Sequence, residues 1–163
     1  MIIVGVDPGL AATGYAFIEK SEKFWHLIDA GVVHTTSRQI FPERLGKIYQ
    51  VVADLIQQYQ PEALSVERLF HAYNAKSAID TGHARGVILL AAVHYHVPVF
   101  EYAATEVKQS VVGNGAASKQ QVQFMVQKLL NLDSPPKPYD KADAIAISLC
   151  HAFRRKNNLK GTN

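Results

Sequence analysis

The feature that most limits the possible folds is the order of the apolar patterns along this 163-residue chain. Short runs of apolar and β-branched residues indicate strands, whereas apolar residues spaced three or four apart indicate helices. Three strand-like segments come first, and helices then alternate with strands. The predicted strands are 2–6, 13–18, 24–35, 63–67 and 97–102, and the predicted helices are about 45–60, 75–96, 105–113, 118–130 and 139–153. Thr105 is the predicted cap of the third helix, and Ser118 with Gln121 predicts a capping box at the start of the fourth.

Three consecutive strands followed by alternation predict a mixed sheet with helices on both of its faces. The ribonuclease H-like fold has this order of elements, so we expect an α/β fold of that kind around a five-stranded mixed sheet. The length suits one domain, and a hydrophobic fraction of 48% suits a globular chain. We therefore predict a single ribonuclease H-like domain over residues 1–153 and a basic, flexible tail over residues 154–163.

Cysteine content, hydropathy and charge limit where such a protein works and what it binds. The one cysteine, Cys150, cannot form an intramolecular disulfide, and its apolar neighbours indicate a buried thiol rather than a nucleophile. No apolar run approaches the roughly 20 residues of a membrane helix, and the N-terminus lacks the basic segment of a signal peptide. We expect a cytoplasmic protein. A net charge of +3 favours an anionic partner such as nucleic acid.

Four acidic residues stand at positions that favour chemistry. Asp7 and Glu67 each close a short apolar strand, although acids are poor strand residues. If the two strands are parallel neighbours, both carboxylates project from one edge of the sheet, where ligands of α/β proteins bind. Asp140 and Asp143 have the i, i+3 spacing that places two side chains on one face of a helix.

Each acid alone has a structural explanation as well. Asp7 could begin a turn, Asp140 could stabilise a helix N-terminus, and Glu67 could pair with Arg68. Together, clustered carboxylates repel one another unless cations neutralise them. Oxygen ligands without a Cys and His cluster favour Mg²⁺, for which Mn²⁺ can substitute. Two such ions about 4 Å apart can activate water and stabilise the leaving oxygen of a phosphodiester, so the acids predict a nuclease.

Taken in order, the motifs of this chain resemble those of the RuvC family of crossover junction endodeoxyribonucleases. The opening Gly5-Val6-Asp7-Pro8-Gly9 does not distinguish that family, because actin-like ATPases begin similarly. The whole ordered set is specific, and it extends from Met1 to about Phe153. Its other parts are Thr13-Gly14-Tyr15, Glu67 with Phe70, and residues 74–78, 84–87, 99–103, 107–109, 112–115 and 140–144.

The resemblance implies an endonuclease that resolves four-way (Holliday) DNA junctions with two symmetric nicks. It implies four metal-binding catalytic acids, which are Asp7, Glu67, Asp140 and Asp143. Phe70 would stack on unpaired bases at the junction centre, and Lys108 and Lys119 would contact DNA near the cut. The family acts as a homodimer beside the RuvA and RuvB branch-migration proteins. The long helix from Ala75, with Gly82 and Gly86 inside it, is the expected dimer interface.

Several positions depart from the usual residues of that family. Arg68 follows the second acid where Gln or Glu is common, and Tyr73 replaces a Lys or Arg. Ala116 stands where Arg is common, and Lys141 replaces an Ala. Asp140 is a His in many members, so this chain follows one of two variants. The departures leave the catalytic set intact and concern the DNA contacts and the sequence preference.

Other interpretations remain open at this point. Lys108 and Lys119 could be solvated helix lysines, and Phe70 could belong to the core. An actin-like ATPase would share the first hairpin but needs two related domains, for which 163 residues are too few. A junction-binding protein without activity and a ribonuclease H-like enzyme on RNA–DNA hybrids are the remaining alternatives. A comparison of substrates in the presence of magnesium would distinguish them.

Overall fold

The computed structural model describes the backbone of residues 1–68 and 75–158 and the side chains of residues 1–68 and 75–155. Its centre is a five-stranded sheet with the strand order β3-β2-β1-β4-β5. This is the predicted five-stranded mixed sheet. The strands are β1 (Ile2–Asp7), β2 (Ala12–Lys20), β3 (Trp25–His34), β4 (Ala63–Glu67) and β5 (Val99–Tyr102).

The pairing of the strands brings the ends of β1 and β4 together. β1 runs antiparallel to β2 and parallel to β4, with Val6 opposite Val66. The next residues along the two strands are therefore Asp7 and Glu67, which lie side by side at one edge of the sheet. The buried Ser65 strengthens this region, because its hydroxyl donates to the carbonyl of Val4 at 3.0 Å.

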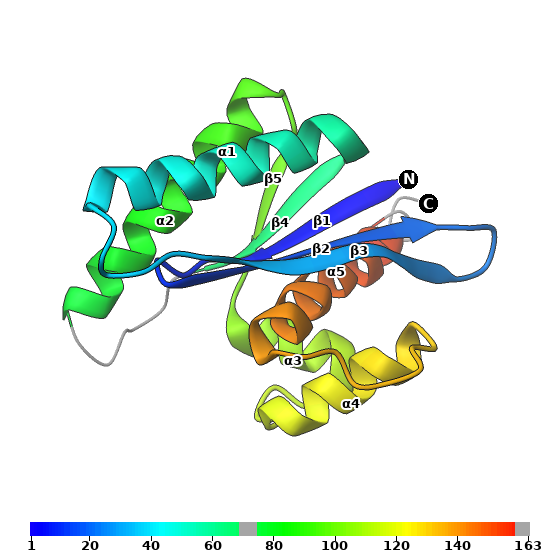
Figure 1. Ribbon diagram of the computed structural model, residues 1–163. Coiled ribbons are helices and arrows are strands. Elements are labelled where there is room, and N and C mark those ends of the chain that lie inside the picture. Colours follow the sequence, from blue (N-terminus) through cyan, green and yellow to red (C-terminus); the bar gives the residue numbers. More distant parts are fainter. Residues whose placement is uncertain (69–74, 159–163) are drawn as a thin grey trace.

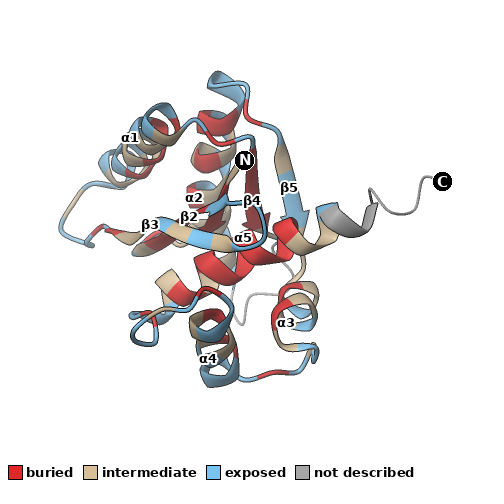
Figure 2. Ribbon diagram, turned by 90° about the vertical axis from the view of Figure 1, so that its right-hand side faces the viewer, coloured by how far each residue is buried: buried red, intermediate tan, exposed pale blue. Residues whose placement is uncertain are grey.

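Helices cover both faces of the sheet, as predicted (Figure 1). One face carries α1 (Phe41–Tyr59) and α2 (Ala75–His94), and the other carries α3 (Ala104–Val112), α4 (Lys119–Leu129) and α5 (Tyr139–Asn158). Each face has its own cluster of buried apolar side chains. Figure 2 shows that α5 is buried over most of its described length, because it lies between the sheet and the pair formed by α3 and α4, which carry more exposed residues.

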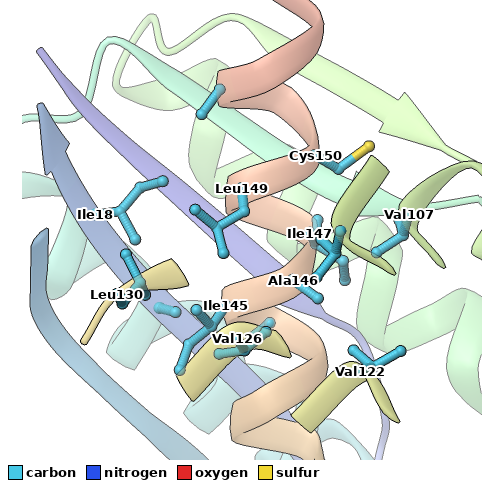
Figure 3. Packing of buried hydrophobic residues seen from close by; sticks show 14 of the residues in the cluster. Ile18, Val107, Val122, Val126, Leu130, Ile145, Ala146, Ile147, Leu149 and Cys150 are labelled. Carbon is cyan, nitrogen blue, oxygen red and sulfur yellow. The ribbon is translucent and has the colours of Figure 1, made fainter. Parts of the chain in front are cut away.

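The central helix α5 lies unusually close to β1 and β2. A Cβ atom on Gly5 would overlap the carbonyl oxygen of Ala144, and one on Gly14 would overlap the carbonyl oxygen of Asp140. Only glycine allows backbones to approach this closely. Ile145, Ile147 and Leu149 then fill the space between α5 and its neighbours (Figure 3). The two glycines therefore determine how near the start of α5 comes to the end of β1.

Several helix boundaries differ from the prediction by a few residues. α3 begins at Ala104, and its N-cap is Ala103 with the Glu106 carboxylate accepting from the Ala103 N–H, so the predicted cap at Thr105 was wrong. The predicted capping box of Ser118 and Gln121 at the start of α4 is confirmed. α5 continues to Asn158, beyond the expected domain boundary at residue 153. No helix in the described part of the chain is long and apolar enough to cross a membrane.

Candidate active site

Three acids from three separate elements line one cavity of about 220 Å³. Asp7 ends β1, Glu67 ends β4, and Asp143 lies in the second turn of α5. All three are partly buried. The cavity is completed by two lysines and by apolar residues from the three helices below the sheet, which are Ala104, Val107, Lys108, Lys119, Val122 and Ile147.

Asp140 lies near this cavity but lines a neighbouring cleft. That cleft is bounded by the β1–β2 turn, by Arg44 of α1 and by the first turns of α2. The charge of Asp140 still acts on the other acids, because it contributes to the raised pKa of both Asp7 and Asp143. The predicted four acids are thus brought to one edge of the sheet, three in one cavity and the fourth beside it.

Burial and crowding make Asp7 hard to ionise. Its pKa is raised from 3.8 to about 8, first by burial and then by the carboxylates of Asp143, Glu67 and Asp140. Burial also raises the pKa of Glu67, with Asp143 as the next cause. Burial is likewise the main reason that the pKa of Asp143 is raised. A site with these properties holds ionised carboxylates only when positive charge is added to it.

The two predicted lysines lie where they supply part of that charge. The ammonium of Lys119 is 3.4 Å from Oδ2 of Asp143, and this carboxylate is the main reason that the pKa of Lys119 is raised. The same nitrogen lies 5.9 Å from the centre of the Tyr139 ring. Lys108 lines the cavity from α3, and its charge acts against the raised pKa of Glu67 and Asp143.

Comparisons with known proteins identify the family. The family model described as "Crossover junction endodeoxyribonuclease RuvC" matches residues 3–151. The chain belongs to the RuvC family. The protein named "Crossover junction endodeoxyribonuclease RuvC" from Natranaerobius thermophilus is 47% identical over 98% of this chain and 100% of its own length. The one of the same name from Halothermothrix orenii is 48% identical over 98% of this chain and 97% of its own.

A solved structure extends the match to three dimensions. The structure described as "T. thermophilus RuvC in complex with Holliday junction substrate" has a TM-score of 0.92 and 35% sequence identity, and the match covers 97% of this chain and 96% of that one. Both the predicted family and the predicted ribonuclease H-like resolvase fold are therefore confirmed. Family membership makes this chain a metal-dependent endonuclease that acts on DNA crossover junctions.

The metal that RuvC-family activity requires has suitable ligands here. The acids of the cavity offer only carboxylate oxygens, the ligands that hard divalent cations prefer. In the ranges 1–68 and 75–155, no three His, Cys, Asp or Glu side chains are arranged to bind one ion together. The donor chemistry and the raised pKa values nonetheless fit a bound cation, which would offset the repulsion among the acids.

Two observations complete the account of the predicted residues. Phe70 and Tyr73 lie outside the described residues, so the structure does not place them relative to the cavity. Tyr139, by contrast, was not predicted, although its ring lies beside Lys119. Its position directly before Asp140 could have drawn attention to it. Without the fold, however, nothing in the sequence joins Tyr139 to a lysine twenty residues earlier.

Proposed function

We propose that this protein resolves Holliday junctions by two symmetric nicks, and that Asp7, Glu67, Asp140 and Asp143 hold the catalytic metal. The observation that supports this assignment most directly is the cavity in which carboxylates from β1, β4 and α5 meet two lysines. Magnesium is the metal that we propose, with manganese as a substitute and two ions per site. When bound, it lowers the pKa of a water and stabilises charge on the phosphate.

The proposal assigns a separate role to each group of side chains. Asp7 is the most deeply buried of the acids in the cavity, so water competes least with it for the bound cation. Lys108 of α3 and Lys119 of α4 both line the cavity, so each can contact a phosphodiester that enters it. Lys119 can exchange its contact with Asp143 for one with a phosphate oxygen, because at 3.4 Å this ion pair is a long one. Phe70 is proposed to stack on unpaired bases at the junction centre.

A homodimer is part of the same proposal. Two equivalent sites are needed for two symmetric nicks, and a two-fold dimer supplies them. The outer face of α2 has the apolar surface that such an interface needs. Ile79 is 57% exposed, Leu90 47% and Val93 63%, and Gly86 leaves open space beside the helix. The RuvA and RuvB proteins are its proposed partners, and a cytoplasmic location remains a prediction.

A panel of substrates tests the proposal. The purified protein is mixed with a four-way junction, a linear duplex or an RNA–DNA hybrid, in magnesium or in EDTA. We expect paired nicks in the junction only, and only with magnesium. Asp143→Asn should abolish nicking but retain junction binding, whereas Asp133→Asn, an exposed acid outside the cavity, should change neither. Cleavage of the hybrid alone would favour a ribonuclease H-like enzyme that acts on RNA–DNA hybrids. Junction binding without nicking would favour a junction-binding protein without activity.

A further inference from the structure

A second cavity, of about 300 Å³, lies at the other end of the sheet from the catalytic acids. We call it the distal slot, and its lining residues are Met1, Lys20, Lys23, Trp25, Ala152, Phe153 and Arg155. It lies between the start of β1, the β2–β3 hairpin and the last turns of α5, which Figure 1 shows at one end of the molecule. β1 separates it from Asp7 by about 17 Å, at roughly 3.3 Å per residue.

The distal slot has an apolar floor and a cationic rim. Trp25 and Phe153 are partly buried and pack against the core cluster under α5. Lys20, Lys23 and Arg155 are exposed around them. No lining residue is acidic. A further aromatic side chain, Phe24, lies on the same hairpin and is 68% exposed. Exposure of such a large apolar side chain to water is unfavourable.

The charges of the rim are only partly neutralised within the chain. Glu62 lies 3.6 Å from the amino group of Met1 and 3.9 Å from Arg155, and its side chain is 53% exposed. Arg155 also contacts the sulfur of Met1. Within the described ranges, no acidic side chain forms an ion pair with Lys20 or Lys23. The hairpin lysines are therefore available to an anionic partner.

We propose that the distal slot binds an acidic segment of a partner protein, with one apolar side chain in the slot and carboxylates on the rim. Aromatic anchors inside a ring of charges are characteristic of protein interfaces. A volume of 300 Å³ accommodates a single large side chain. A DNA backbone would match the rim but has no apolar group for the floor, and the chemistry of the nuclease lies at the opposite end of the sheet.

The chain contains a built-in reporter, because Trp25 is its only tryptophan. The probe is a synthetic peptide of alternating Glu and Leu residues, titrated into the full-length protein while tryptophan fluorescence is followed. We expect a saturable change that weakens as salt rises. A Glu and Ser peptide tests the need for apolar side chains, and a Lys and Leu peptide tests the need for negative charge. Neither control peptide should produce the change.

Matched variants locate the binding. The double variant Lys20→Glu, Lys23→Glu should weaken peptide binding at least tenfold, whereas Lys128→Glu, Lys137→Glu, with the same charge change at exposed positions outside the slot, should not. Both variants should melt at the wild-type temperature. The absence of any saturable change with the Glu and Leu peptide would overturn the proposal, as would equal weakening by both variants.

Nucleic acid is the competing occupant. If short duplex DNA changes Trp25 fluorescence and the Lys20→Glu, Lys23→Glu variant loses junction affinity, the slot is a DNA contact and the proposal is wrong. We expect junction cleavage by the purified variant to equal that of the wild type. The fluorescence test uses no catalysis, so a failed function at the acidic site would leave its result unaffected.

Discussion

Asp7→Asn should stabilise the metal-free protein while it abolishes cleavage. The raised pKa of Asp7, about 8 against 3.8, means that the folded state retains a proton that the unfolded state releases between these two pH values. Stability therefore falls as pH rises through this window, by about 1.36 kcal/mol per pH unit for one proton. The amide of asparagine does not titrate in this pH range, so the variant does not lose stability as the pH rises through it.

The size of the effect follows from the same values. At pH 7 the solution is about three units above the ordinary pKa and still below the raised one, so the cost approaches roughly 4 kcal/mol. We expect Asp7→Asn to gain between about 2 and 4 kcal/mol in EDTA at pH 7 and little below pH 4. In magnesium the wild type should become more stable than Asp7→Asn, because a cation that binds only the folded wild type stabilises it further.

Urea unfolding in EDTA at several pH values measures this difference. Asp133→Asn serves as the matched control, because it makes the same chemical change at an exposed loop position. Its stability should follow that of the wild type at every pH. If Asp7→Asn and the wild type unfold at the same urea concentration from pH 4 to pH 9, Asp7 is neither desolvated nor crowded by the other acids, and the argument fails.

Five further predictions concern the two proposed DNA-contacting residues, Tyr139, Gly14 and the proposed dimer interface. Lys119→Ala should reduce the slope of log binding constant against log salt concentration by about 0.9 for junction binding, as expected for one lost phosphate contact. Tyr139→Leu should reduce cleavage more than Tyr139→Phe, which keeps the ring, and an equal loss would exclude a role for the ring. Gly14→Ala should lower the thermal midpoint or prevent folding, as circular dichroism would show, because a Cβ there meets the start of α5. Phe70→Ala should slow junction cleavage more than it weakens binding, and a wild-type rate would refute stacking. Val93→Glu should shift the dimer to monomer in sedimentation, and an unchanged dimer would place the interface elsewhere.

Much of the fold was predictable because its signals are local. The apolar runs that end at Asp7 and Glu67 are short and uninterrupted, so they identify two strands and place an acid at the end of each. The cap at Ser118 was equally clear from two residues. Ala103 has no side-chain oxygen, and its helix is capped instead by the carboxylate of Glu106. That arrangement gives no signal at the cap position itself, so the start of α3 was misplaced.

The arrangement of the site depends on contacts that local patterns do not contain. The spacing of Asp140 and Asp143 predicts one shared helix face, and three residues rise by about 4.5 Å along a helix. Which of two clefts each acid enters depends on the height at which α5 crosses β1 and β2. Gly14 determines that height at Asp140 and Gly5 determines it at Ala144. Asp140 is therefore held against the β1–β2 turn, while Asp143, one turn later, reaches the cavity of Asp7 and Glu67. Because the same contact places both acids, an added methyl group at Gly14 would displace the two proposed metal ligands of α5 together, and no single acid substitution could reproduce that effect.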